Sequence, residues 1–169
     1  MIGKTVMKHN IFIIPDKIDI PDTYILKTKE AVTETLNIEQ IDITCNINVL
    51  MTNDEGIREY NRMYRGIDKP TDVLSFPMQD FTCPGTEGLI NAEFDEDTGE
   101  LLLGDVVISM ESVKRQAIEY KNSVDHELTY MTVHSVLHLM GYDHDNTENE
   151  KLMHGKTEDV LKMMGYKMK

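Results

Sequence analysis

The amino-acid sequence predicts an α+β protein with a single mixed β-sheet of about four strands flanked by helices. Residues 41–51 alternate apolar and polar side chains, as a strand with one buried face does. Residues 101–108 are almost continuously apolar, which suits a strand covered on both faces. Segments with helical spacing lie between the predicted strands, and no repeat or linker divides the chain. We therefore expect residues 1–169 to form one domain.

The N-terminal part of the chain should begin with a strand and a helix. Residues 11–14 are all apolar and are followed by Pro15, which suits a strand that ends there. Apolar side chains then recur at roughly helical spacing over residues 22–36, which predicts the first helix. The alternating strand at residues 41–51 follows this helix.

The middle of the chain should add a helix, a strand and a long loop. Thr52 and Glu55 have the spacing of a capping box, which predicts a helix over residues 53–64. Residues 69–77 have the composition of a strand bounded by prolines. Residues 79–100 are rich in glycine and acidic side chains, which favours a long loop or a loose hairpin before the strand at residues 101–108.

The C-terminal part should consist of three helices. Serines precede the apolar patterns of the first two, which should cover residues 109–120 and 124–141. Thr147 and Glu150 repeat the capping-box spacing and predict a last helix that ends near residue 164.

The charge of the chain limits the classes of function. A formal net charge of -13 argues against a protein that coats nucleic acid non-specifically, because the neutralisation of phosphates drives such binding. Four basic side chains nevertheless cluster in one segment, at Arg58, Arg62, Arg65 and Lys69. This segment could form a local RNA-binding groove on an acidic protein, or it could be ordinary solvated surface.

The sequence also predicts the compartment. Cys45 and Cys83 form no CxxC pair, which favours two free thiols over a disulfide. The apolar run near the N-terminus is too short for a signal peptide, and no stretch approaches the ~20 apolar residues of a membrane span. We expect a cytoplasmic protein with no membrane contact.

Three histidines, His134, His138 and His144, have the spacing of a metal site at the C-terminal end of the central helix. His134 and His138 are four residues apart and therefore share one helix face. Gly141 can end the helix in a left-handed conformation and turn the chain back, so that His144 approaches the same ion. Three imidazoles leave one tetrahedral position for water, which is typical of catalytic zinc. Zinc is favoured over nickel or iron, which imidazole also binds.

The residues beside the histidines narrow the chemistry. Zinc proteases with the same histidine spacing carry a glutamate as general base directly after the first histidine, where this chain has Ser135. The glutamate-dependent peptidase mechanism is therefore absent at this position. Asp143 and Asp145 could accept the second ring proton of a histidine ligand, or they could cap the turn.

The arginines of the basic segment favour phosphodiester substrates over peptides. A guanidinium can make bidentate hydrogen bonds to phosphate oxygens, which a peptide carbonyl would not require. Arg65 lies at the predicted end of a helix and is followed by Gly66, so it is the first candidate for this role, with Arg62 second. The alternative for Arg58 and Arg62 is solvent exposure or pairing with a nearby glutamate.

Three segments together resemble the YbeY family, bacterial endoribonucleases that are also described as ribosomal RNA maturation factors. They are NRMYRGIDKPTDVLSFP at residues 61–77, LGDVVIS at residues 103–109 and HSVLHLMGYDH at residues 134–144. The resemblance implies a zinc-dependent endoribonuclease for single-stranded RNA that acts in small-subunit ribosomal RNA maturation and ribosome quality control. It further implies three histidine ligands and a role in activity for Arg65.

One departure from the family pattern is visible. The family usually has glycine after the first histidine, and Ser135 would add a side chain next to the metal. Two other functions remain open from the sequence. One is a zinc-dependent hydrolase of peptide or amide bonds, and the other is a non-catalytic ribosome-assembly factor with a structural zinc.

Overall fold

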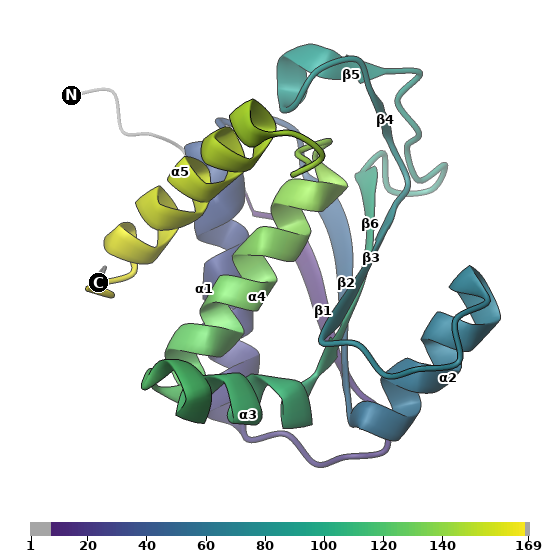
Figure 1. Cartoon of the computed structure of the whole chain (residues 1–169). Coiled ribbons are helices and arrows are strands. Elements are labelled where there is room, and N and C mark those ends of the chain that lie inside the picture. Colours follow the sequence, from purple (N-terminus) through teal and green to yellow (C-terminus); the bar gives the residue numbers. More distant parts are fainter. Residues whose placement is uncertain (1–7, 168–169) are drawn as a thin grey trace.

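Figure 1 shows the computed structural model of the chain, in which residues 8–167 are described. A four-stranded sheet has the order β1-β2-β6-β3. Its strands are Asn10–Pro15 (β1), Cys45–Thr52 (β2), Leu101–Ser109 (β6) and Val73–Pro77 (β3). β1, β2 and β6 are parallel, and β3 pairs antiparallel with β6 at the edge of the sheet. The predicted α+β fold with one mixed sheet is confirmed.

The helices cover the two faces of the sheet unequally. They are Asp22–Ile38 (α1), Asp54–Arg65 (α2), Met110–Tyr120 (α3), Val124–Leu139 (α4) and Thr147–Met163 (α5). α1 and α4 pack beside the sheet on one side, whereas α2 lies apart from them (Figure 1). The main core contains fully buried side chains from α1, β2 and α4, such as Leu36, Ile47 and Leu137. Because α4 also contacts α1, α3, α5 and β3, it is the central helix that the sequence predicts.

The helix α2 has a small core of its own. Its buried Ile57 contacts Leu74 of β3 and Val107 of β6. Tyr60 of α2 and Phe76 of β3 are partly buried around them. This cluster is separate from the main core, and it places the C-terminal end of α2 near the edge strand.

The two predicted capping boxes are wrong by one residue. Asn53 caps α2 by accepting a hydrogen bond from the backbone N–H of Gly56, and Asn146 caps α5 in the same way. Thr52 still belongs to β2, and Thr147 is already the first helical residue. Asparagine is as strong an N-cap as threonine, so the residue one position earlier takes the role.

Two predicted strands are shorter in the structure. β2 begins at Cys45 because the chain before it completes the C-terminus of α1. There Gln40 has a φ of 55°, and the Ile41 N–H donates to the Leu36 carbonyl, which is a Schellman arrangement. β3 begins at Val73, because the residues before it are tied to α2.

The segment at residues 79–100 is a loose hairpin, as expected. It contains two short antiparallel strands, Asp80–Phe81 (β4) and Leu89–Ile90 (β5), joined through a 3-10 turn at Thr86–Gly88. Cys45 and Cys83 are free thiols, as predicted. None of the helices within residues 8–167 has the length and apolar character needed to cross a membrane.

Candidate metal centre

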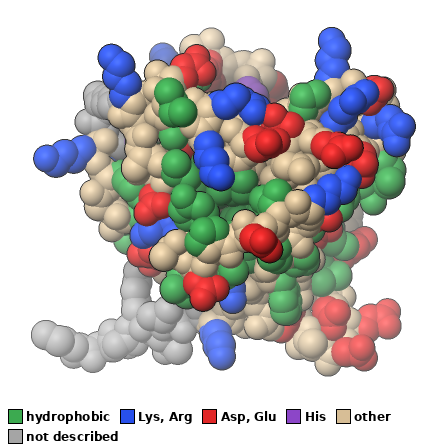
Figure 2. Space-filling view, turned by 90° about the horizontal axis from the view of Figure 1, so that it is seen from below, with side chains coloured by type: hydrophobic (Ala, Val, Ile, Leu, Met, Phe, Trp, Pro, Cys, Tyr) green, Lys and Arg blue, Asp and Glu red, His purple; other side chains and the backbone are tan. Residues whose placement is uncertain are grey.

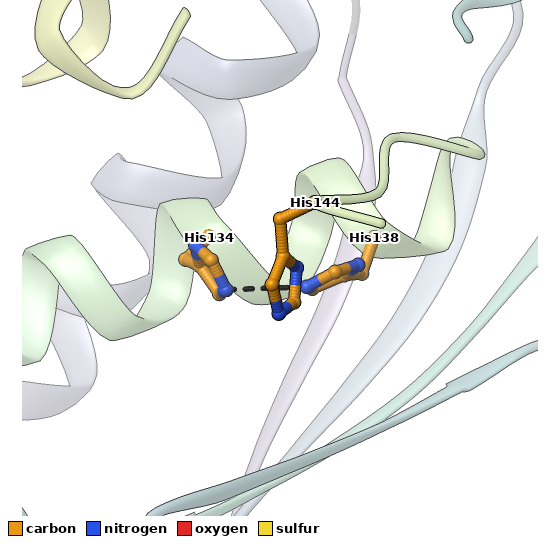
Figure 3. A group of neighbouring side chains, drawn as sticks. All are labelled: His134, His138 and His144. Carbon is orange, nitrogen blue, oxygen red and sulfur yellow. Dashed lines mark hydrogen bonds between the residues drawn. The ribbon is translucent and has the colours of Figure 1, made fainter. Parts of the chain in front are cut away.

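The three histidines meet where α4 ends. His134 and His138 lie one helical turn apart, and His144 reaches them from the loop after the helix (Figure 3). One ligand atom from each histidine can be chosen so that these atoms all lie within 4.8 Å of one another. Each imidazole of this group could therefore contribute a nitrogen to one bound ion.

Gly141 makes this convergence possible. It has a φ of +85°, and the Tyr142 N–H donates to the Leu137 carbonyl at 3.1 Å. This Schellman arrangement reverses the chain directly after the helix. A Cβ at Gly141 would also lie 2.7 Å from Cβ of Phe81, which belongs to β4. The predicted role of this glycine is confirmed, and contact with the hairpin adds a second reason for it.

A backbone carbonyl orients His138. Its Nδ1 lies 2.9 Å from the Tyr142 carbonyl oxygen, which can only accept, so Nδ1 carries the proton. The unprotonated Nε2 then lies 3.1 Å from Nε2 of His134 and faces the centre of the group. Metal-bound histidines commonly have such a hydrogen bond on the second nitrogen. Sequence reasoning missed Tyr142, because a main-chain acceptor has no residue-type signal.

His134 and His138 are suited to remain neutral. Burial and the neighbouring His138 and His144 imidazoles lower the pKa of His134 to about 4. Burial also lowers the pKa of His138. Neutral imidazole is the form that binds metal, so these donors fit zinc and other first-row ions. No cysteine or carboxylate within residues 8–167 joins the three-histidine group, and three protein ligands are typical of an open site.

Two of the three predicted neighbours of the histidines, Ser135 and Asp145, have their polar atoms bound elsewhere in the structure. Ser135 is fully buried, and its hydroxyl donates to the Met131 carbonyl at 2.7 Å. The expectation that Ser135 adds a side chain next to the metal is therefore wrong, because adjacent helical residues point in different directions. Asp145 accepts from the side-chain amide of Asn149 at 2.7 Å, as a turn-capping residue does.

Asp143 has a local partner as well. One of its carboxylate oxygens accepts from the backbone N–H of His144 at 2.7 Å. The same oxygen lies 3.6 Å from Nδ1 of His144, which is too long for a hydrogen bond. In the structure Asp143 thus makes the hydrogen bond of a turn-capping residue.

A cleft of about 1230 Å³ connects the histidines with Arg65. Its walls include β3, Tyr130 of α4 and Tyr64 of α2. Arg65 is the last residue of α2, and Gly66, with a φ of 69°, turns the chain there. Residues 65 and 134 are thus brought to one cleft although they are far apart in the chain.

The other three basic candidates do not line this cleft. Both Nε and Nη2 of Arg58 bind the Asp68 carboxylate, at 2.8 and 3.1 Å, and this pairing raises the pKa of Arg58. Arg62 and Lys69 are exposed. Asp68, rather than the glutamates considered from the sequence, is the partner of Arg58. The predicted basic groove is thus reduced to Arg65 at the cleft itself.

Charges of both signs are mixed elsewhere on the surface. On the face that Figure 2 shows, Lys and Arg side chains are interspersed with Asp and Glu side chains, and no continuous basic patch forms. This distribution agrees with the net charge of -13. A polyanion would therefore find no broad attraction across this face.

Two of the carboxylates that line the cleft, those of Asp72 and Glu127, are held by other groups. Asp72 accepts from the backbone N–H of Val73 and from the Gln116 amide, at 2.9 and 3.1 Å. Glu127 is 4% exposed and accepts from the Asn122 amide at 2.5 Å. Neither residue occupies the position that the general-base glutamate has in zinc proteases, directly after the first histidine.

The amino-acid sequence is similar to those of known proteins over most of its length. The profile of the family described as Endoribonuclease YbeY matches residues 11–165. Endoribonuclease YbeY of Acetivibrio thermocellus is 43% identical over 154 residues, which cover 89% of this chain and 93% of that protein. Endoribonuclease YbeY of Agathobacter rectalis is 40% identical over 144 residues, covering 82% of this chain and 87% of that protein.

A solved structure has the same fold. The solution structure of TM1509 from Thermotoga maritima superposes with a TM-score of 0.56 at 26% identity. The superposition covers 91% of each chain. Both the sequence match and the fold extend over nearly the whole length, and the chain belongs to the Endoribonuclease YbeY family.

Proposed function

We propose that this protein is a metal-dependent endoribonuclease that cleaves single-stranded RNA in the cleft between α4 and β3. The observation that carries the proposal is that three convergent imidazoles and one arginine line the same cleft. Its relatives are named endoribonucleases, which supports an RNA phosphodiester as the substrate. We further propose that zinc is the ion and that residues 1–169 act as one hydrolase domain.

The chain would contribute two separate functions to the reaction. His134, His138 and His144 would hold the ion, which when bound supplies a Lewis acid and lowers the pKa of water. Arg65 would bind the phosphate through two parallel hydrogen bonds and stabilise the negative charge that grows in the transition state. The exposed position of Arg65 at a helix end leaves its guanidinium accessible to such a substrate.

We propose small-subunit ribosomal RNA as the natural substrate, with ribosomal or assembly proteins as partners and the cytoplasm as the location. A protein of net charge -13 gains little from general attraction to RNA. Partner proteins would therefore be needed to bring the RNA to the cleft. Exposed aromatic side chains beside the cleft, such as Tyr64 at 62%, offer stacking surfaces for unpaired bases.

The test compares two arginines of the same helix. Arg65 lines the cleft, whereas Arg62 does not, so Arg62→Ala is a matched control for Arg65→Ala. With zinc-loaded protein and a labelled single-stranded RNA, Arg65→Ala should lower kcat/KM by about 10²-fold to 10³-fold, as loss of a transition-state donor does. Arg62→Ala should stay within about twofold of the wild type.

Further arms separate the reaction classes. A duplex RNA and a peptide should remain uncut, and His138→Ala should abolish cleavage. Equal losses in both arginine variants, or cleavage that survives His138→Ala, would contradict the proposal. Cleavage of the peptide but not of RNA would instead support the amide hydrolase. The structural-zinc alternative requires a fourth protein ligand, and none joins the histidines within residues 8–167.

A further inference from the structure

Tyr142 connects the metal centre to a buried charged group on the far side of the loop. Its backbone carbonyl accepts from Nδ1 of His138 at 2.9 Å. Its side chain is only 6% exposed, and the hydroxyl donates to Oε2 of Glu39 at 2.7 Å. One residue therefore joins a histidine ligand to the C-terminal end of α1.

Glu39 is itself held from a third helix. It is 8% exposed, and its Oε1 lies 2.9 Å from Nζ of Lys156 in α5. Glu39 is the C-cap residue of α1, where the helix dipole disfavours a negative charge. A carboxylate at such a buried position needs Lys156 and the Tyr142 hydroxyl as compensating partners.

The hairpin at residues 79–100 packs against the contact between Glu39 and Tyr142. A Cβ at Gly85 would lie 3.3 Å from Oε2 of Glu39 and 3.7 Å from the Tyr142 hydroxyl. The Gly85 N–H donates to the Met140 carbonyl at 3.0 Å. The main chain between Met140 and Tyr142 is thus fixed by a backbone hydrogen bond on one side and by a buried side chain on the other.

We infer that Glu39, Tyr142 and Lys156 are positioning residues that set the orientation of His138 and through it the affinity of the metal centre. Glu39 and Lys156 do not line the cleft, so they act through Tyr142. The hydroxyl of Tyr142 fixes the loop, the loop fixes the carbonyl, and the carbonyl keeps the proton on Nδ1 of His138. Loss of such an outer hydrogen bond typically weakens metal binding by 10-fold to 100-fold. This inference rests on the proposed metal site.

The test removes one hydroxyl at a time. Tyr142→Phe should raise the Kd for zinc by up to about 10-fold, measured by competition with a chromophoric chelator, because the carbonyl itself remains and only its support is lost. Tyr166→Phe is the matched control, because the Tyr166 hydroxyl likewise makes one hydrogen bond to a side chain, accepting from Thr129, but it does so in the N-terminal half of α4. Its Kd should equal that of the wild type. Glu39→Gln keeps an acceptor for Tyr142 and should retain more affinity than Glu39→Ala.

A second measurement needs neither metal nor RNA. The ¹⁵N shifts of the His138 ring in the metal-free protein report which nitrogen carries the proton. The wild type and Tyr166→Phe should show protonated Nδ1, and Tyr142→Phe should show a mixture of both tautomers. An unchanged tautomer together with an unchanged zinc Kd in Tyr142→Phe would overturn the inference. If the wild type takes up no zinc while the tautomer still changes in Tyr142→Phe, the positioning role stands and the proposed metal-dependent function falls.

Discussion

At the scale of single residues, the candidate metal centre depends on a few atoms with fixed directions. Nδ1 of His138 donates a hydrogen bond to the Tyr142 carbonyl, and this leaves Nε2 to face the other histidines. Burial keeps His134 neutral at pH 7, because its pKa is lowered to about 4. Neutral imidazole is the form that binds metal, so His134 does not first have to lose the charge of an imidazolium.

Gly141 gives the first prediction at this scale. Gly141→Ala should lower the free energy of unfolding by about 2–4 kcal/mol, because the residue has a φ of +85° and its new Cβ would lie 2.7 Å from Phe81. Gly165→Ala is the control, since Gly165 has a φ of +86° but nothing within 4 Å of its Cβ position. The control should lose only about 1 kcal/mol in urea denaturation. Equal losses in the two variants would show that the contact with Phe81 is unimportant.

The histidines were predictable from the sequence because local rules govern them. Spacing of four residues places two side chains on one helix face, and a glycine after the helix reverses the chain. The tautomer of His138 was not predictable, since it depends on a main-chain acceptor. Ser135 was misjudged for a related reason, because its neighbour in sequence, His134, points to the cleft while Ser135 points to the core.

At the scale of elements, α2 and α3 are joined by one carboxylate. Asp54, the first residue of α2, accepts from both Ser109 and Ser112, and its other oxygen binds Arg115 at 2.6 Å. The hydrogen bond from Arg115, assisted by Ser109, lowers the pKa of Asp54 despite partial burial. This group links the start of α2 to the N-terminus of α3.

Asp54→Asn gives a prediction with a defined pH dependence. A folded-state pKa below the unfolded value means that ionised Asp54 stabilises the fold above the unfolded pKa of about 3.9 and that this contribution is lost as pH falls through the folded pKa. The variant should be less stable by about 1 kcal/mol at pH 7, since solvent screens the pair. The difference should shrink below about pH 4 in denaturation measured across pH. A constant difference at all pH values would mean that the charge of Asp54 is not the cause.

Element boundaries were less predictable than the elements themselves. The helices and the strands lie close to their predicted places, since apolar periodicity identifies them. Their ends depend on competition between neighbouring polar residues, and Asn53 and Asn146 took the capping roles from Thr52 and Thr147. The apolar alternation at residues 41–51 begins before the true start of β2, because Ile41 is buried as part of a helix end rather than as part of a strand.

At the scale of the whole molecule, metal binding should be linked to stability. An ion that binds only the folded chain stabilises it, by about 2.7 kcal/mol at a concentration of 100 Kd. Zinc should therefore raise the melting temperature of the wild type. The rise should disappear in His138→Ala and remain in His154→Ala, which alters an exposed histidine outside the group. Thermal denaturation with and without zinc measures this, and an equal rise in all three proteins would place the ion elsewhere.

The cleft could not be assembled from the sequence alone. Arg65 and the histidines are separated in the chain by β3, the β4–β5 hairpin, β6 and α3, and both α2 and α4 contact β3, which lines the cleft between them. Arg65 was named from its place at a predicted helix end, and the family resemblance agreed, but neither supplied this geometry. The same tertiary arrangement directs Arg58 toward Asp68 and away from the cleft, which no local pattern indicates.

The separate small core under α2 has a consequence for how the protein would lose activity. The helix that carries Arg65 packs on the sheet through the small core of Ile57, Leu74 and Val107. His134 and His138 belong to α4, which packs in the main core. Helices with few buried contacts open at lower free energy than the global unfolding transition. Amide protons of α2 should therefore exchange with solvent faster than those of α4. On the proposed function, gentle warming would therefore displace Arg65 while the three histidines stay together, and cleavage would stop before the fold melts.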